Sequence, residues 1–284
     1  MWLLIPYGVF LGDERMMGKV NVLNSAGTDF TAVTELTGYR VTQEQLDRMY
    51  TRYCFAAEFS NGREVLEIAC GSGQGLGYLA KRAKRVVGGD YDEKIVRKAQ
   101  KHYGNRVEIR QLDAHCLPFE NQSFDLVLLY EAIYYLAEPH KSILEVSRVL
   151  KDDGLFIICT ANRDWSGFNP SPYSHQYFSA PELYGILAQS GFKKVELFGD
   201  CPVRTEGMKD KVFSQIKRMA VALHLMPKTM KGKELLKRIF VGKLLSLPPE
   251  ISEGLARYSP PLPITSKLPN RDYKVLFALA QKQS

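Results

Sequence analysis

Short runs of apolar residues alternate along most of the chain with longer stretches in which apolar residues recur every three or four positions. The short runs are rich in β-branched and aromatic residues and hold few charges, which predicts strands buried on both faces. We expect these strands at residues 64–69, 85–89, 107–111, 124–129, 155–160, 194–198 and 273–280. Strands that alternate with helices predict an α/β fold with a doubly wound, mostly parallel sheet, whose ligand crevice lies at the carboxyl ends of the strands.

Capping signals indicate where the intervening helices begin. Thr42 followed by Gln45 is a capping box, and so is Ser179 followed by Glu182. Asp92 is placed to cap a third helix. The expected helices cover residues 42–60, 75–84, 92–103, 139–150 and a stretch from 179 that stops at Gly191.

The composition favours an ordinary folded protein. Of the 284 residues, 45% are hydrophobic and 24% are charged, which argues against a disordered, collagenous or membrane-spanning chain. The length allows one elaborated domain or two small ones. We expect a lead-in at residues 1–40, a core at 41–199 plus 271–284, and an insert at 200–270 that precedes the last strand.

The positive charge is concentrated in the insert. Residues 204–243 hold eleven Lys or Arg and three Asp or Glu, so they carry +8, and the remainder of this +7 chain carries −1. Met208, Val212 and Ile216 fall on one face, which predicts an amphipathic basic helix. Residues 246–270 are rich in proline, which predicts an irregular strap.

A basic amphipathic helix is compatible with several partners. It can lie on an anionic membrane surface, hold a phosphate-bearing glycan carrier, or fold over the crevice as a lid. It can equally be a solvated charged face over an apolar core stripe. Nucleic acid is the less favoured partner, because aromatic residues are sparse among the bases of residues 204–243.

The cysteines and the start of the chain favour a cytoplasmic protein. Five cysteines are an odd number, and they form no C-x-x-C pair and no zinc spacing, so we expect reduced thiols and no metal. The apolar opening MWLLIPYGVFLG lacks a basic leader and is too short to span a bilayer. We therefore expect neither a signal peptide nor a transmembrane helix, and at most a peripheral contact with the inner face of the membrane.

A glycine-rich turn follows the first predicted strand of the sheet. It contains Gly71, Gly73 and Gly75, and Asp90 follows the next strand. Glycines let the backbone approach a cofactor closely, and a carboxylate about 20 residues further on can bind both hydroxyls of a ribose. A dinucleotide fingerprint requires a third glycine where this chain has Leu76, so that class of cofactor does not fit.

A second acid, Asp113, follows the third strand of the sheet and precedes Ala114. A carboxylate there can accept a hydrogen bond from the exocyclic amine of adenine, and Tyr91 can stack on the ring. Asp113 can also be an ordinary turn residue, and Tyr91 can simply cover the sheet edge. Two acids at consecutive strand ends indicate adenosine.

These residues resemble a known enzyme family. The stretch from Glu67 to Gly75, with Asp90, the Asp113-Ala114 pair and the strand at 124–127, is similar to the class I S-adenosylmethionine-dependent methyltransferases, over about residues 42 to 200 plus the final strand. The resemblance implies a Rossmann-like methyltransferase sheet and S-adenosylmethionine as cofactor. It also implies that Glu67 belongs to the cofactor site and that Tyr53 closes over the methionine end. Tyr130, Tyr134 and Tyr135 follow the fourth strand, where aromatic faces can surround the sulfonium or a sugar ring, and Tyr134 or Tyr135 can equally be core packing.

A narrower resemblance concerns the acceptor. Residues 37–40, 52–56, 160–163 and the stretch from Asn169 to His175 resemble the methyltransferases of bacterial surface-polysaccharide and glycan gene clusters. Ala161 replaces a proline of that pattern, and His175 lies three residues later than the pattern places its histidine. The resemblance implies a sugar or glycan acceptor.

Methyl transfer is an in-line displacement, so the protein mainly has to align donor and acceptor. For a hydroxyl acceptor, a general base helps, and His175 and Glu131 are the candidates. His175 can also be a solvated loop residue, and Glu131 can orient a backbone amide or the cofactor. We therefore expect a methyltransferase that O-methylates a sugar, a glycan precursor or a related small or lipid-linked metabolite. An RNA methyltransferase and a non-catalytic adenosine-binding module remain as alternatives, and the oligomeric state is left open.

Overall fold

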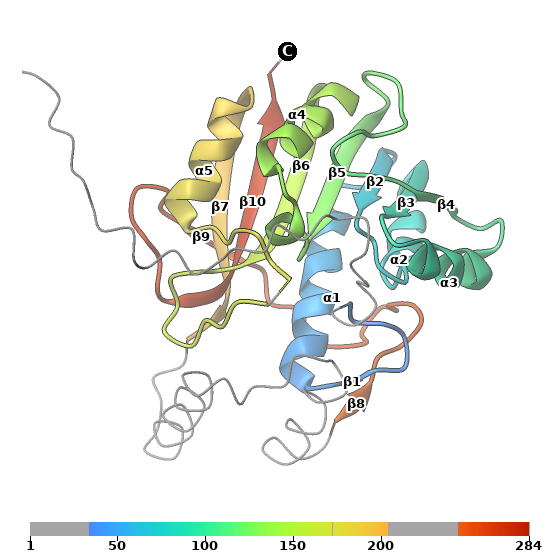
Figure 1. Ribbon diagram of the computed structural model, residues 1–284. Helices are drawn as coiled ribbons and strands as arrows, with labels where there is room; N and C mark the ends of the chain where they lie inside the picture. Colours follow the sequence, from blue (N-terminus) through green and yellow to red (C-terminus); the bar gives the residue numbers. More distant parts are fainter. Residues whose placement is uncertain (1–33, 172, 204–243, 284) are drawn as a thin grey trace, which may run out of the picture.

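The computed structural model describes residues 34–171, 173–203 and 244–283, and within them an eight-stranded sheet carries helices on both faces (Figure 1). Its strands are β2 (Glu64–Ile68), β3 (Arg85–Asp90), β4 (Glu108–Gln111), β5 (Phe124–Tyr130), β6 (Leu150–Ala161), β7 (Phe192–Pro202), β9 (Leu262–Ile264) and β10 (Tyr273–Lys282). Their order is β4-β3-β2-β5-β6-β10-β7-β9. Neighbours from β4 to β6 are parallel, whereas β10 is antiparallel to β6 and β7, and β9 is antiparallel to β7. The expected α/β fold with a mostly parallel, doubly wound sheet is confirmed.

The helices begin where the caps predict. They are α1 (Gln43–Glu58), α2 (Leu76–Ala80), α3 (Glu93–Tyr103), α4 (Pro139–Val149) and α5 (Ala180–Gln189). Thr42 and Ser179 form complete capping boxes with Gln45 and Glu182, and the Asp92 carboxylate accepts from the Lys94 amide.

Several elements differ in length from the prediction; the strand expected at residues 194–198, for example, is β7, Phe192–Pro202. The helix expected to reach residue 84 ends at Ala80 and continues as a turn, in which the amides of Arg82 and Ala83 donate to the Leu79 carbonyl and no side chain of residues 81–84 is fully buried. The strand expected from residue 155 already begins at Leu150, which is fully buried and pairs with Phe124 of β5.

The two faces of the sheet carry different helices. Alternate residues of β5 point to opposite sides: Leu126 and Leu128 join a core with α1, α2 and α3, while Val127 and Leu129 join a core with α4 and α5. This alternation follows from the period of two along a strand. Helix α1 therefore covers the same face as the glycine-rich turn that leads into α2.

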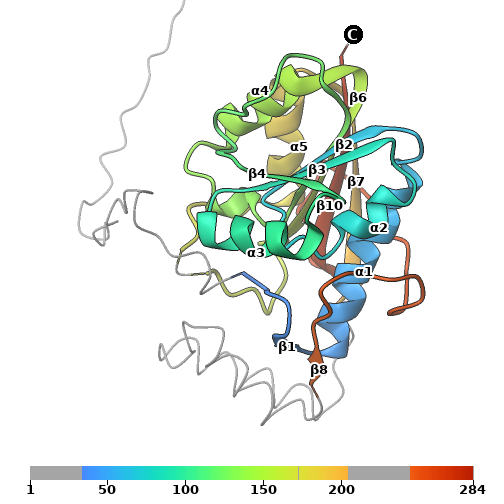
Figure 2. The ribbon, with the colours of Figure 1, turned by 90° about the vertical axis from the view of Figure 1, so that its right-hand side faces the viewer.

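A small two-stranded sheet lies beside the start of α1 (Figures 1 and 2). It pairs β1 (Arg40–Val41) with β8 (Leu245–Ser246), so chain segments about 200 residues apart meet there. The Pro-rich stretch at 246–270 holds no helix but contributes β9 to the edge of the main sheet. Residues 1–33 and the amphipathic helix expected within 204–243 lie outside the described residues.

Candidate active site

The sheet has a topological switch point at its centre. The chain runs from β2 outward to β3 and β4, and then returns to β5 on the other side of β2. In open α/β sheets the ligand crevice lies at the carboxyl ends of strands at such a point. Apart from Tyr53 on α1 and His175 after β6, the predicted site residues lie at or near the carboxyl ends of β2, β3, β4 and β5, so the fold gathers them at one edge.

The glycine turn uses a backbone geometry that glycine adopts more readily than other residues. Gly71 and Gly73 have φ values of 60° and 81°, in the left-handed region. A Cβ on Gly75 would lie 1.9 Å from the ring of Tyr53, so α1 packs directly on the turn. The third glycine of the motif therefore serves helix packing, and the first two serve the bend of the backbone.

Asp90 is held by the backbone of this turn. It is 8% exposed, its Oδ2 accepts from the Gly71 amide at 3.0 Å, and its Oδ1 accepts from the Asp92 amide at 3.1 Å. Burial raises the pKa of Asp90, and the two amide donors oppose that rise. Each carboxylate oxygen keeps a further lone pair, so a ribose diol fits this group as a hydrogen-bond donor.

The residues expected at the adenine lie around the end of β4. Asp113 is exposed, and its Oδ1 accepts from the His115 amide at 2.8 Å and lies 2.7 Å from the His115 Nδ1. Ala114 is buried, and Tyr91 is 43% exposed. The imidazole of His115 was not anticipated, although an acid two residues before a histidine is a visible local signal.

A second buried acid of this edge is Glu67 of β2. Glu67 is 1% exposed, and its Oε1 accepts from the Tyr53 hydroxyl at 2.7 Å. Its other oxygen has no hydrogen-bond partner within the described residues. Burial raises the pKa of Glu67 to about 7, against the opposing effects of Tyr53 and Arg52. Tyr130 crosses Tyr53 edge to face at 5.6 Å and donates to the Arg52 carbonyl at 3.1 Å.

Arg52, which sequence reasoning did not single out, lies near Glu67 and Tyr53. Its Nε is buried and has no hydrogen-bond partner in the described part of the chain. An orphaned guanidinium nitrogen and the orphaned Glu67 oxygen are charged groups of opposite sign, and a buried polar atom without a partner is costly. An amino-acid zwitterion fits both, its carboxylate to Arg52 and its ammonium to Glu67. These residues thus fit the methionine moiety of S-adenosylmethionine.

Glu131 comes directly after β5 and is already engaged. Its φ is 51°, and its amide donates to the Cys159 carbonyl at 2.7 Å, which turns the chain away from the sheet. The carboxylate forms an ion pair with Arg48 at 2.8 Å and accepts from the Tyr134 hydroxyl at 3.1 Å. Arg48, one turn before Arg52 on α1, was not anticipated either.

His175 is brought to the same edge by its backbone. Its amide donates to the Tyr134 carbonyl at 2.8 Å, and its side chain is exposed. Nearby, the Tyr134 ring stacks on Tyr177 at 4.5 Å, and Phe168 meets Tyr177 edge to face at 4.7 Å. We refer to Tyr134, Tyr177 and Phe168 as the aromatic group. The loop after β6 therefore places flat apolar rings beside the Glu131 carboxylate.

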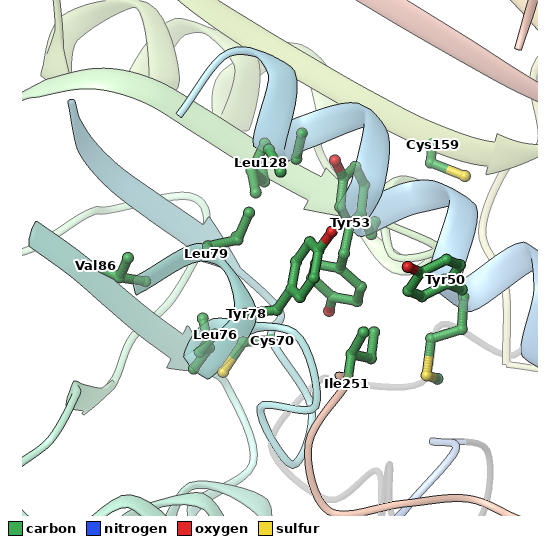
Figure 3. Packing of buried hydrophobic residues seen from close by; sticks show 14 of the residues in the cluster. Tyr50, Tyr53, Cys70, Leu76, Tyr78, Leu79, Val86, Leu128, Cys159 and Ile251 are labelled. Atoms are coloured by element: carbon green, nitrogen blue, oxygen red, sulfur yellow. The ribbon is translucent and has the colours of Figure 1, made fainter. Parts of the chain in front are cut away.

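A remote segment braces the glycine turn. Ile251 donates its amide to the Gln74 carbonyl at 2.8 Å, and its side chain packs in the same cluster as Tyr53 and Tyr50 (Figure 3). The Gly38 amide donates to the Leu247 carbonyl at 2.9 Å. We call residues 244–254 the brace, since they connect the start of α1 with the outside of the turn.

Other site types find little support within the described residues. No group of three His, Cys, Asp or Glu is placed to hold a metal ion there. No helix in residues 34–203 and 244–283, residue 172 aside, is both long and apolar enough to cross a bilayer. Two surface hollows, of about 280 Å³ between β7 and β9 and about 540 Å³ beside α3 and β4, contain none of the predicted site residues.

Comparison with known proteins identifies a shared domain. Residues 66–158 match the family described as "Methyltransferase domain". A probable S-adenosylmethionine-dependent methyltransferase of Mycobacterium tuberculosis is 32% identical over 187 residues, which cover 62% of this chain and 67% of the relative.

Two further proteins extend the comparison. A ubiquinone biosynthesis O-methyltransferase of Roseobacter denitrificans is 29% identical over 178 residues, which cover 55% of this chain and 70% of the relative. The solved structure of an S-adenosylmethionine-dependent methyltransferase from Archaeoglobus fulgidus superposes with a TM-score of 0.52 at 16% identity, and covers 85% of this chain and 95% of that one. At this identity the superposition supports the fold alone.

Proposed function

Because the chain belongs to the S-adenosylmethionine-dependent methyltransferases, and is thus an enzyme that uses S-adenosylmethionine, we propose that it methylates a hydroxyl group of a sugar, a glycan precursor or a related small or lipid-linked metabolite. The family assignment removes the non-catalytic adenosine-binding module from the alternatives. The observation that carries the acceptor proposal is the aromatic group beside Glu131 at the end of β5.

We assign the cofactor to the edge formed by β2, β3 and β4. Asp90 binds the ribose hydroxyls, and Asp113, Ala114 and Tyr91 surround the adenine. Gly71, Gly73 and Gly75 let the backbone approach the cofactor. The bound cofactor supplies a methyl group activated by its positively charged sulfur. The chain's own contribution is to hold both partners in line and to exclude water between them.

We assign the methionine end to Glu67 and Arg52, with Tyr53 and Tyr130 beside them. The unpaired Glu67 oxygen and the unpaired Arg52 nitrogen support this assignment. Substituting Arg52→Met is expected to lower the affinity for S-adenosylhomocysteine about tenfold and to leave the affinity for adenosine unchanged, since adenosine has no carboxylate. Calorimetric titration of both ligands measures the difference, and an equal loss for both would remove Arg52 from the methionine end.

The acceptor side lies at the ends of β5 and β6. An aromatic face can pack against the apolar face of a sugar or another ring, while nearby carboxylates accept from its hydroxyls. His175 and Glu131 are our candidate bases for the acceptor hydroxyl, and Glu131 also holds Arg48. The similarity to a protein named as an O-methyltransferase favours oxygen as the methylated atom.

The motif at residues 160–163 supports the hypothesis of a glycan acceptor only in part. Asn162 donates to the carbonyls of Asn270 and Tyr273, both at 2.7 Å, and accepts from the Asp164 amide at 3.0 Å. This residue therefore fixes the loop that carries the aromatic group, and acts on an acceptor through that loop rather than by contact.

The experiment that tests the acceptor class is a transfer assay with isotopically labelled S-adenosylmethionine. The panel contains nucleotide sugars, lipid-linked sugars, hydroxylated ring compounds and transfer RNA. We expect methylation of a sugar or ring hydroxyl that is identified by mass spectrometry. Exclusive methylation of RNA, with binding that weakens steeply as salt rises, would replace the proposal by the RNA alternative.

We further propose that residues 204–243 contact an anionic membrane surface or a phosphate-bearing carrier through their +8 charge. Co-sedimentation with vesicles that contain anionic lipid, at low and high salt, tests this contact. Equal sedimentation with neutral vesicles would contradict it.

A further inference from the structure

Asp200, close to the end of β7, is a buried acid to which the proposed mechanism gives no part. It is 8% exposed. It lies two residues after Phe198, which packs against Phe55 of α1 with ring centroids 5.5 Å apart. Since side chains two apart on a strand share a face, Asp200 lies on the α1 face of the sheet.

The strand register fixes how far along the sheet Asp200 lies. Phe198 pairs with Phe277 of β10, and Phe277 pairs with Cys159 of β6. Two residues onward, Asp200 pairs with Val275, and Val275 pairs with Ala161, the last residue of β6. Asp200 is therefore level with the carboxyl end of β6, the edge at which the aromatic group and Glu131 lie.

Helix α1 presents two cations at this level. Arg52 and Arg48 precede Phe55 by about one and two turns. Burial has the largest effect on the pKa of Asp200 and raises it, whereas the charges of both arginines lower it. Arg48 is already paired with Glu131. The remaining cation, Arg52, is the one assigned above to the methionine carboxylate.

Asp200 itself has few partners. Its carboxylate accepts from the Cys201 amide, and the Cys201 thiol lies 3.8 Å from its Oδ2. No ion pair joins it to any described residue. A buried carboxylate without a cationic partner is costly, and such groups concentrate at functional sites.

We propose that Asp200 binds the acceptor hydroxyl and takes its proton during methyl transfer, an inference that rests on the proposed function. With Arg48 paired to Glu131 and Arg52 paired to the methionine carboxylate, Asp200 is an acid on the acceptor side of this edge that forms no ion pair with a cation of residues 34–203 or 244–283, residue 172 aside. A hydroxyl donates to it readily, whereas an acceptor carboxylate or phosphate is repelled. The acceptor therefore presents a neutral hydroxyl at the position to be methylated.

The proton and electrons balance without a further reactant. The acceptor oxygen forms a bond to the methyl carbon, the bond between that carbon and sulfur breaks, and its electron pair stays on sulfur. The hydroxyl proton passes to the Asp200 carboxylate and then to solvent. A general base of this kind contributes about a hundredfold to ten-thousandfold to the rate.

The main test is Asp200→Asn, compared with Glu196→Gln four residues earlier on the same strand, where Glu196 pairs with Lys194. With the acceptor that the wild type methylates, we expect Asp200→Asn to lower kcat at least about a hundredfold, to keep the affinity for S-adenosylhomocysteine, and to remove the acidic limb of the pH profile. Asp200→Glu should recover part of the rate, and Glu196→Gln should behave as wild type.

The groups that face Asp200 set the interpretation of that profile. They are Arg48 and Arg52 of α1, Cys159 of β6, Cys201 of β7 and Tyr258 of the C-terminal segment. An acidic limb that persists in Asp200→Asn but disappears in His175→Ala would assign the base to His175 and overturn the proposal. An unchanged kcat in Asp200→Asn would overturn it as well.

A readout independent of turnover separates this proposal from the proposed function. NMR follows the carboxyl carbon signal of Asp200 in the wild type as pH is varied. The signal is assigned to Asp200 because it disappears in Asp200→Asn. A midpoint above the ordinary 3.8 supports an acid without a cation, whereas a midpoint below 3.8 would show a stable pair with an arginine and overturn the inference. If the wild type methylates only RNA, the proposed function fails. The NMR titration and the comparison of Asp200→Asn with wild type still test the role of Asp200 separately.

Discussion

The two halves of the carboxyl edge hold their charged groups in different ways. On the cofactor side, Asp90 is fixed by two backbone amides, one from the glycine turn. On the acceptor side, Glu131 is held by the side chain of Arg48 and the hydroxyl of Tyr134, and Asp200 has no cationic partner among the residues that the structure describes. Backbone donors are fixed by the fold and suit a ligand that never changes. Side-chain partners can be exchanged by substitution, which suits the half that determines which acceptor is bound.

The largest expected effect tests the cofactor side. Asp90→Ala removes two hydrogen bonds of a charged group to a ribose, each worth about 1.5–3 kcal/mol, so the affinity for S-adenosylhomocysteine should fall at least about a hundredfold. Calorimetric titration measures it. Asp92→Ala is the matched control: it removes a helix cap at a cost of about 1 kcal/mol but should keep the affinity within about threefold. Equal losses in the two variants would mean that Asp90 acts only on the helix.

The second prediction concerns the pH dependence of stability. The folded protein raises the pKa of Glu67 from the ordinary 4.5 to about 7, so it binds this proton more tightly than the unfolded chain does. The contribution of Glu67 to stability is therefore full below pH 4.5 and is lost as pH rises to about 7, a change of about 3 kcal/mol.

Urea unfolding of the wild type and of Glu67→Gln at pH 5 and pH 8 measures this difference. The wild type should lose more stability than the variant between the two values. Parallel behaviour of the two proteins would contradict a Glu67 carboxyl group whose pKa is raised by burial.

The third prediction concerns the contact between α1 and the glycine turn. Gly75→Ala places a Cβ 1.9 Å from the Tyr53 ring, which has to move away from Glu67, so the free energy of unfolding should fall by about 1–3 kcal/mol. Gly185→Ala in α5, where an added Cβ meets nothing within 4 Å, should instead stabilise by a few tenths to about 1 kcal/mol. A Gly75→Ala protein as stable as wild type would show that the helix does not pack on the turn in solution.

The smallest expected effect is on the acceptor side. Arg48→Gln leaves Glu131 without its ion pair, and should lower the rate of methyl transfer about tenfold while the affinity for S-adenosylhomocysteine stays within twofold. A loss of cofactor affinity as large as that of Asp90→Ala would remove the distinction between the two halves.

The same distinction decides how much of the site could be predicted. Gly71, Gly73 and Asp90 follow two consecutive strands, so local spacing alone indicated that they meet. The caps at Thr42, Asp92 and Ser179 are likewise local, and the structure confirms them.

The acceptor side could not be predicted in this way. Arg48 pairs with Glu131, and both arginines act on Asp200 by their charge, only because α1 packs over β5, β6 and β7, which are distant in sequence. The same holds for Gly75, whose local pattern indicated a tight turn but not the aromatic ring on which it packs. Helix periodicity indicates that α1 has a buried face, but not which strands that face covers.

The brace has a consequence for the natural variation of this enzyme. Because residue 247 forms backbone hydrogen bonds with residues 38 and 39, just before β1, and residue 251 forms one with the glycine turn, the fold fixes the position of residue 244. Insertions and deletions among relatives should therefore accumulate well upstream of residue 244 and spare the eleven positions that follow. We expect a variant with a deletion upstream of residue 244 to keep its affinity for the cofactor only if the deletion leaves residues 244–254 in place.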